Sequence, residues 1–131
     1  MLIAALALAS PDSSDASDFA VVAYLPEWRY EGANWEKISE HTTHLLLFSA
    51  EPSANGKIVA KDRLPRPELL AEARAAATRH GTKLLICFGG NGRSAGFSPM
   101  VRSRKARRRF VRELVELCDE LGLDGVDYNW E

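Results

Sequence analysis

Apolar residues occur in short runs that are bounded by turn-forming residues. Three runs are continuous, and a fourth segment of similar length closes the chain: Phe19–Leu25, His44–Ser49, Lys83–Phe88 and Gly125–Glu131. Pro26 stops the first run, Asn55-Gly56 follows the second and Gly89-Gly90 follows the third. Continuous runs of this length are typical of strands that are buried on both faces. The pattern therefore predicts four strands.

Helical signals fill the gaps between these strands. Pro67 stands at a first-turn position before strong helix formers from Glu68 to Ala77, and Gly81 closes that helix. Ser98-Pro99 opens a longer predicted helix that runs to Gly122. Its apolar positions keep a 3.6-residue spacing and are Phe110, Leu114, Leu117, Cys118 and Leu121. A shorter helix is predicted from Trp35 to Ser39.

Strands and helices thus alternate along the chain, which predicts an α/β fold with a parallel sheet and right-handed crossovers. Two architectures have this alternation. A doubly wound open sheet would be complete at about this length, whereas a closed eight-stranded barrel needs ~250 residues. The pattern alone does not choose between them.

Composition narrows the class of protein. The 131 residues are 46% hydrophobic and 27% charged, with a formal net charge of -1, so the chain is globular and is not a uniformly basic nucleic-acid binder. Two cysteines are too few for a disulfide scaffold, and the apolar surroundings of Cys87 and Cys118 predict free buried thiols. No stretch reaches the ~20 apolar residues of a membrane span.

The first eighteen residues differ from the rest. Met1 to Ala9 are almost all Leu, Ile and Ala, and small and acidic residues follow to Asp18. Ala7-Leu8-Ala9 is similar to a signal-peptidase cleavage site, although no Lys or Arg precedes the apolar stretch. The residues fit a short secretory signal and a frayed apolar terminus equally well. We take 1–18 as a separate segment and 19–131 as the folded domain.

The closing strand carries the chemistry. Because side chains alternate along a strand, Asp127, Asn129 and Glu131 point to one face. Three polar groups on one face of a buried strand would cost several kcal/mol to desolvate unless that face lines a site. The alternative is an edge strand with one face in water. The apolar strands before it, and the large Tyr128 and Trp130 opposite, favour a site.

These residues resemble a known family. Asp124-Gly125-Val126-Asp127-Tyr128-Asn129-Trp130-Glu131 resembles the DxxDxDxE signature of glycoside hydrolase family 18, the chitinases and their relatives. Lys83 to Gly90 is similar to the SxGG strand that precedes the signature, Val21 to Trp28 to the first strand, and Thr43-His44-Leu45 to the start of the second. The resemblance covers Phe19 to Glu131. It implies a partial (β/α)8 TIM barrel, with strands one to four and the first three helices.

The resemblance also implies roles for the signature residues. Glu131 takes the place of the general acid that protonates the glycosidic oxygen, and the substrate's own N-acetyl oxygen is the nucleophile. Asp127 matches an Asp that supports the next carboxylate of the signature, whose place Asn129 takes. Asp124 matches a mainly structural Asp, and Cys87, Gly89 and Gly90 take the SxGG positions. The expected substrate is chitin or a related N-acetylglucosamine oligosaccharide, with no cofactor or metal.

This sequence departs from the family pattern at two positions. Asn129 replaces an Asp, so the acetamido group loses a charged partner, although an amide still accepts and donates hydrogen bonds. Cys87 stands where the family usually has Ser. We expect the 131-residue chain to be inactive alone, because strands five to eight would supply half of the groove. A chitinase in the full-length protein and a non-catalytic glycan-binding lectin both fit the signature.

Other features leave alternatives open. Trp28 matches a sugar-stacking position of the family, but an ordinary Trp at the rim or in the core would give the same sequence pattern. Tyr24 matches an aromatic residue near the acetamido pocket, but a tyrosine that only fills the core would also give the same pattern. Gly89-Gly90-Asn91-Gly92 lacks the spacing and the Lys of a phosphate loop. The histidines show no metal-ligand spacing, and a divalent ion on the closing strand would lack a supporting loop.

A basic run precedes the closing strand, with six cations in eight residues: Arg102, Arg104, Lys105, Arg107, Arg108 and Arg109. Such a run fits a nucleic-acid patch or the solvated face of a helix. We favour the solvated face, because Phe110, Leu114 and Leu117 continue the helix with an apolar stripe. We therefore predict a glycan partner, no nucleic acid, no membrane, and a secreted protein. The sequence does not indicate an oligomeric state.

Overall fold

A computed structural model describes residues 19–131, so the segment 1–18 and its signal-peptide interpretation lie outside the described residues. The elements, in chain order, are β1 (Val22–Pro26), η1 (Glu27–Arg29), α1 (Trp35–Glu40), β2 (His44–Pro52), β3 (Ile58–Val59), η2 (Lys61–Arg63), α2 (Pro67–His80), β4 (Lys83–Gly89), α3 (Phe97–Arg102), α4 (Arg104–Leu121) and β5 (Gly125–Asn129). All four predicted strands form, and β3 is a short addition.

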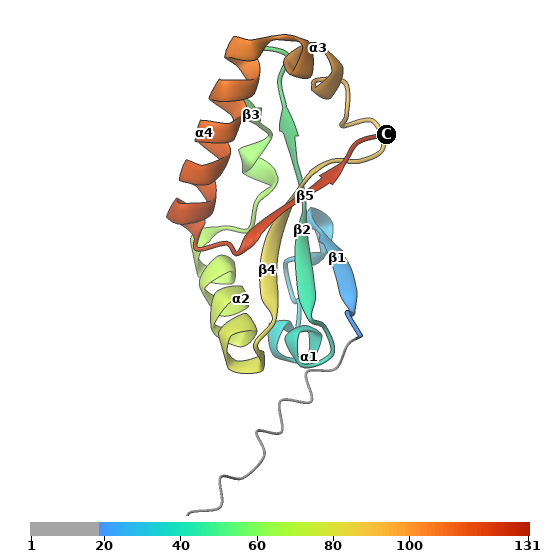
Figure 1. The fold of residues 1–131 in the computed structure, drawn as a ribbon. Helices are drawn as coiled ribbons and strands as arrows, with labels where there is room; N and C mark the ends of the chain where they lie inside the picture. Colours follow the sequence, from blue (N-terminus) through green and yellow to red (C-terminus); the bar gives the residue numbers. More distant parts are fainter. Residues whose placement is uncertain (1–18) are drawn as a thin grey trace, which may run out of the picture.

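Four of the strands form one parallel sheet in the order β1-β2-β4-β5 (Figure 1). The two-residue β3 pairs antiparallel with the end of β2. The register aligns Leu25, Leu47, Ile86 and Val126 in one row across the sheet. The predicted parallel sheet with helical crossovers is therefore confirmed.

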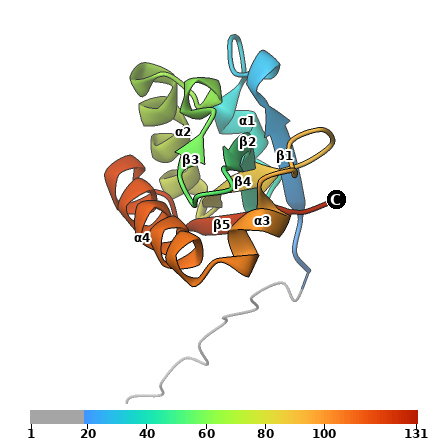
Figure 2. The same cartoon turned by 90° about the horizontal axis from the view of Figure 1, so that it is seen from above.

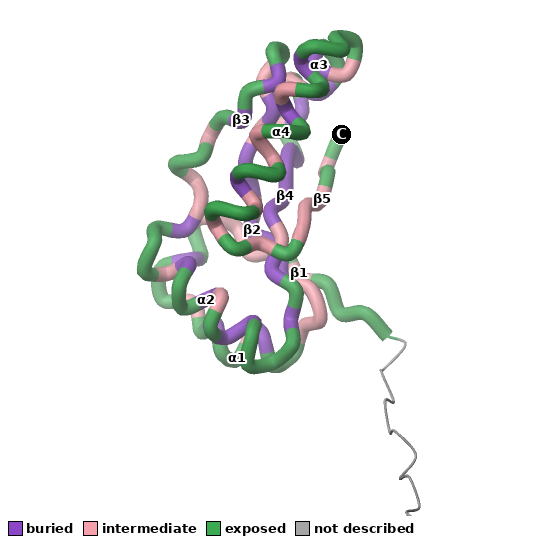
Figure 3. Tube along the Cα trace, turned by 60° about the vertical axis from the view of Figure 1, so that its left-hand side comes forward, coloured by how far each residue is buried: buried purple, intermediate pink, exposed green. Residues whose placement is uncertain are grey.

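The helices cover the face of the sheet that this row occupies (Figure 2). The core lies between the two layers, and its strand residues alternate with residues on the opposite face. From the sheet it takes Leu45, Leu47, Leu84, Ile86 and Phe88, and from the helices Leu70, Ala73, Ala76, Ala77, Phe110 and Leu117. In Figure 3 the buried residues follow β2 and β4, whereas the outer turns of α4 are exposed. Residues 19–131 contain no helix with the length and apolar character needed to cross a bilayer.

The prediction of one long helix from Ser98 to Gly122 is wrong, because this stretch forms two helices, α3 and α4. Ser103 has an extended backbone (φ -102°, ψ 116°), and its hydroxyl accepts a hydrogen bond from the Ala106 N–H at 3.2 Å. Ser103 is therefore the N-cap of α4, and the Ser98-Pro99 signal belongs to α3 alone. The apolar stripe of 3.6-residue spacing lies on α4.

The prediction that the first strand is buried on both faces is also wrong. β1 is an outer strand of the sheet, and Val22 and Tyr24 remain 54% and 49% exposed. The other outer strand, β5, ends at Asn129 rather than at Glu131. Cys87 is a fully buried free thiol, as predicted, but Cys118 is only partly buried.

Candidate active site at the carboxyl ends of the strands

Asp127 and Asn129 lie on the face of β5 that points away from the helices. Asp127 is aligned with Cys87 and Asn129 with Gly89 on the neighbouring strand β4. Tyr128 lies on the other face, where its ring meets the rings of Phe97 and Phe110. The alternation predicted from the sequence therefore places the polar side chains of β5 together on the uncovered face.

Asp127 is the centre of a cluster of hydrogen-bonding side chains. The Tyr24 hydroxyl donates to Asp127 Oδ2 at 3.0 Å, across the uncovered face from β1. Burial, together with this hydrogen bond and the charge of Asp127, raises the pKa of Tyr24 to about 12. Burial and a hydrogen bond to Asp127 likewise raise the pKa of Cys87 to about 12. Both groups therefore stay protonated at neutral pH, and the Tyr24 hydroxyl is a hydrogen-bond donor to this carboxylate.

The main chain of Asn129 is fixed against the turn that follows β4. Its carbonyl oxygen accepts hydrogen bonds from the Gly90 N–H at 2.7 Å and from the Ser94 hydroxyl at 3.1 Å. Gly89 and Gly90 have φ values of +94° and +99°, which favour glycine. A Cβ on Gly89 would lie 2.4 Å from the Asn129 oxygen, and one on Gly90 would lie 2.5 Å from the Phe48 ring. The two glycines thus let the strand ends approach.

Glu131 follows β5 and is exposed. Its N–H donates to the Ser94 hydroxyl at 3.3 Å, so its main chain is held beside the same turn. Within the described part of the chain its carboxylate has no hydrogen-bond or ion-pair partner. A carboxylic acid in this position is available to donate a proton to a bound molecule.

Asp124 lies at the opposite end of β5. Its carboxylate accepts a hydrogen bond from the Leu84 N–H at 2.8 Å, and its own N–H donates to the Leu84 carbonyl at 2.8 Å. These two bonds fix the start of β5 against β4. Asp124 therefore sets the register of the strand and does not face the cluster around Asp127.

Trp28 and Tyr24 have different surroundings. Trp28 lies in η1, directly after the carboxyl end of β1, and is 66% exposed, so it is not a core residue. The Tyr24 ring meets the Phe48 ring edge to face, with centroids 6.2 Å apart. Because parallel strands end at the same edge of a sheet, Trp28 lies on the same edge as the ends of β4 and β5.

Sequence reasoning missed an ion pair at this edge. Arg93 donates two hydrogen bonds to the Glu27 carboxylate, of 2.6 and 3.2 Å, and a third of 3.0 Å to the Ser49 hydroxyl. The Ser49 hydroxyl in turn donates to the Gly89 carbonyl at 2.9 Å. The only sequence signal is that Glu27 and Arg93 each lie in the connection that follows a predicted strand. A local pattern does not reveal a pair 66 residues apart.

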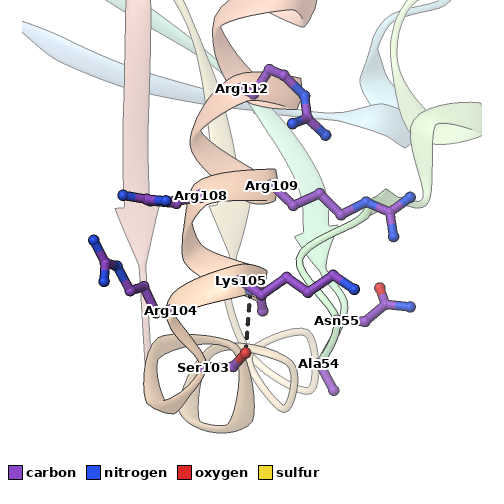
Figure 4. A pocket seen from close by; sticks show the side chains of 9 residues that line it. Ala54, Asn55, Ser103, Arg104, Lys105, Arg108, Arg109 and Arg112 are labelled. Atoms are coloured by element: carbon purple, nitrogen blue, oxygen red, sulfur yellow. Dashed lines mark hydrogen bonds between the residues drawn. The ribbon is translucent and has the colours of Figure 1, made fainter.

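Four cations of the predicted basic run line a pocket between α4 and the loop that carries Ala54 and Asn55 (Figure 4): Arg104, Lys105, Arg108 and Arg109. Lys105 and Arg109 extend towards the loop that carries Asn55, whereas Arg104 and Arg108 extend to the other side of the helix. Arg109 also pairs with Glu113 at 2.8 Å. The cations diverge from the helix, as in the predicted solvated face.

Within residues 19–131, no three His, Cys, Asp or Glu side chains are grouped so that they could hold a metal ion.

Comparisons with known proteins decide the family. The family model for glycosyl hydrolases family 18 matches residues 20–131. The chain belongs to glycosyl hydrolases family 18. It is 29% identical over 126 residues to probable chitinase 10 of Drosophila melanogaster. This match covers 88% of this chain and 6% of the fly protein.

Solved structures of family 18 proteins have the same fold. The chitinase RmChi1 of Rhizomucor miehei matches 86% of this chain with a TM-score of 0.68 and 25% identity, and this match covers 34% of that chain. Human YKL-39, a pseudo-chitinase with retained chitooligosaccharide binding, matches 86% with a TM-score of 0.67 and 24% identity, and this match covers 32% of that chain. The parallel sheet and its helices are therefore part of a (β/α)8 barrel, and the doubly wound alternative is excluded. The chain is chitinase-like and spans about a third of these structures.

Proposed function

We propose that the full-length protein hydrolyses β-1,4 bonds beside N-acetylglucosamine units in chitin or a related glycan, with retention of configuration. The observation that carries this proposal is the cluster at the end of β5. Tyr24 donates to Asp127 on the uncovered face, where Cys87 of β4 lies beside Asp127, and Asn129 and the free carboxylate of Glu131 follow at and just after the end of β5.

In the proposed mechanism Glu131 is the general acid. It protonates the glycosidic oxygen as the bond to the leaving sugar breaks, and the acetamido oxygen of the substrate attacks the anomeric carbon from the other side. Water then opens the resulting cyclic intermediate, and the Glu131 carboxylate accepts the proton of that water. Double displacement at one carbon leaves its configuration unchanged.

Asp127 and Asn129 support this reaction in different ways. The Asn129 side chain can donate one hydrogen bond to the acetamido group and accept another, which would hold the nucleophilic oxygen towards the anomeric carbon. Asp127 accepts a hydrogen bond from Tyr24 and lies beside Cys87, which fixes the polar face next to Asn129. Trp28 offers an exposed indole on which a sugar ring can stack.

The experiment is a turnover assay with the full-length protein on a chromogenic chitobioside. We expect Glu131→Gln to abolish hydrolysis while leaving oligosaccharide binding in place, because the amide cannot supply the proton. Glu116→Gln, an exposed carboxyl on α4, is the matched control and should keep full activity. Turnover that survives Glu131→Gln would contradict the proposed acid. The 131-residue chain alone should show no turnover, since positioning supplies ~7 to 11 kcal/mol of such barriers and half of the groove is missing.

A second function, a glycan-binding lectin without hydrolysis, is favoured by one observation. Asn129 removes a carboxylate from the signature, and one structural neighbour, YKL-39, is a pseudo-chitinase that binds chitooligosaccharides. Binding of (GlcNAc)4 without turnover in the parent protein would support the lectin. Either function agrees with an extracellular protein, which we propose from the chitinase relatives and from the apolar residues Met1 to Ala9.

A further inference from the structure

Arg93 lies near the carboxyl ends of β1 and β4 and beside β2. It belongs to the connection between β4 and α3, and its N–H donates to the Gly90 carbonyl at 2.8 Å. The turn that brings β4 close to Asn129 therefore also carries Arg93. The guanidinium group reaches from this turn to residues that follow β1 and to the middle of β2.

The contact with Glu27 is a two-pronged ion pair. The Arg93 and Glu27 side chains are only 19% and 23% exposed, and both guanidinium Nη atoms bond the carboxylate. Burial alone would raise the pKa of Glu27, but the hydrogen bonds and charge of Arg93 outweigh it and hold this pKa below its usual value. Glu27 is therefore ionised at neutral pH, and Arg93 holds it in one orientation.

This ion pair fixes the segment that carries Trp28. Glu27 is the first residue of η1 and Trp28 is the second. The exposed Trp28 indole has no ring contact within the described residues, so its position is set by the η1 backbone. Tyr30 anchors the far end of η1, since it is buried and its hydroxyl donates to the Phe48 carbonyl at 3.4 Å. Loss of Arg93 would loosen η1 without unfolding it.

Arg93 also touches the Asp127 cluster. Its guanidinium carbon lies 5.1 Å from the centroid of the Phe48 ring, in a cation–π contact. Phe48 packs edge to face on Tyr24, which donates to Asp127. One side chain thus contacts both the segment that presents Trp28 and the aromatic residue that supports the catalytic face.

We propose that Arg93 is a positioning residue for sugar binding. By clamping Glu27 it holds the Trp28 indole at a fixed place relative to Asp127, so that one sugar ring of a glycan can stack on the indole while another reaches Asn129 and Glu131. The inference rests on the proposed function, in that it assigns to Arg93 a role in holding the same glycan.

The test is a double-mutant cycle measured by calorimetric titration of (GlcNAc)4 into the full-length protein carrying Glu131→Gln, which should bind the glycan without hydrolysing it. We expect Arg93→Gln to weaken binding about 10-fold, which corresponds to about 1.4 kcal/mol. In the Trp28→Ala background the same change should alter affinity less than about 2-fold, because Arg93 acts through Trp28. Arg93→Lys keeps the positive charge but cannot make the two hydrogen bonds of the guanidinium to the Glu27 carboxylate, so it should bind more tightly than Arg93→Gln and less tightly than the parent. Arg109→Gln breaks a comparably exposed ion pair on α4 and should change nothing.

A second measurement needs no ligand. The Tyr30 N–H donates to the Glu27 carbonyl at 3.3 Å, so its hydrogen exchange reports the order of η1. Exchange at Tyr30 should be faster in Arg93→Gln and unchanged in Arg109→Gln. Unchanged exchange at Tyr30, or equal effects of Arg93→Gln with and without Trp28, would overturn the proposal. Faster exchange in a protein that does not bind (GlcNAc)4 would instead overturn the proposed function and leave Arg93 as the clamp of η1.

Discussion

Asn129 is the residue on which the choice between hydrolase and lectin depends. It is the last residue of β5, it stands two positions before Glu131, and it carries no charge. A carboxylate at this position would repel the ionised form of the acid and keep Glu131 protonated to higher pH. An amide supplies hydrogen bonds without that repulsion.

We therefore predict that Asn129→Asp moves the alkaline limb of the rate profile to higher pH in the full-length protein, and that it raises the maximal rate by orienting the acetamido group better. A repulsion of ~1.4 kcal/mol would move the limb by about one pH unit. The measurement is turnover of a chitobioside against pH. Asn129→Ala should lower the rate and leave the limb in place. Coincident limbs for parent and Asn129→Asp would refute the electrostatic argument, and inactivity of both would favour the lectin.

The tyrosines make a second prediction at this scale. The pKa of Tyr24 is about 12, and burial raises the pKa values of Tyr30 and Tyr128 as well. A raised pKa means that the folded state holds the proton more tightly than the unfolded state. The resulting stabilisation is complete below pH 10 and is lost as the pH rises from 10 towards 12.

All three tyrosines of the chain are in this group, so the folded chain should show little tyrosinate absorbance at pH 10. Absorbance at the tyrosinate band should appear at higher pH, together with loss of the folded circular-dichroism signal. Tyr24→Phe removes the hydroxyl that donates to Asp127, so the loss of folding stability above pH 10 should be smaller in this variant than in the parent. A normal titration near pH 10 with the fold intact would show that these hydroxyls are not held as described.

At the scale of elements, α4 has its charges arranged against the helix dipole. The cations lie in its first half and the acids in its second: Arg104, Lys105, Arg107, Arg108, Arg109 and Arg112, then Glu113, Glu116, Asp119 and Glu120. The amino-terminal end of a helix favours negative charge and the carboxyl-terminal end favours positive charge. Ser103 caps the helix, but no acidic residue lies in its first turn.

Arg104→Glu should therefore stabilise the chain. An acid in the first turn is favourable by ~0.3 to 1 kcal/mol, and it would pair with Arg108 one turn later. Urea denaturation at low salt should show the gain, and 0.5 M NaCl should reduce it because the charges are exposed. Lys57→Glu, which makes the same charge change outside any helix, is the control. An equal gain in Lys57→Glu would mean that overall charge, and not the helix dipole, is responsible.

The elements also show which parts of the fold a local pattern can predict. Three continuous apolar runs and the alternating segment Gly125–Glu131 predicted all four parallel strands, because both patterns are local properties of a strand. The break at Ser103 was missed because one serine between two helical segments has no periodicity of its own, and β3 was missed because two residues are too few for a pattern. Similarly, Asp127 and Asn129 follow from alternation along β5, whereas the Arg93–Glu27 pair spans β2 and depends on the order of the strands in the sheet, which the sequence pattern does not give.

For the whole molecule, the uncovered edges of the sheet decide behaviour in solution. β1 and β5 are the outer strands of the parallel sheet, and parallel strands usually have both faces covered and both edges paired. Large side chains are half exposed along these edges: Val22 and Tyr24 on β1, and Tyr128 and Trp130 on and after β5. Unpaired strands with exposed apolar side chains are templates for pairing with another chain.

We predict that the 131-residue chain, taken by itself, self-associates. Sedimentation velocity at rising concentration should give an average mass above 14.5 kDa. Val22→Lys places a charge on the β1 edge and should shift the distribution towards monomer, because a buried lysine would oppose strand pairing. Val111→Lys is the matched control, since Val111 is 56% exposed but lies on α4, and it should leave the association unchanged. A monodisperse monomer with a sharp, cooperative thermal transition would show that the four strands and their helices are stable without partners at their edges.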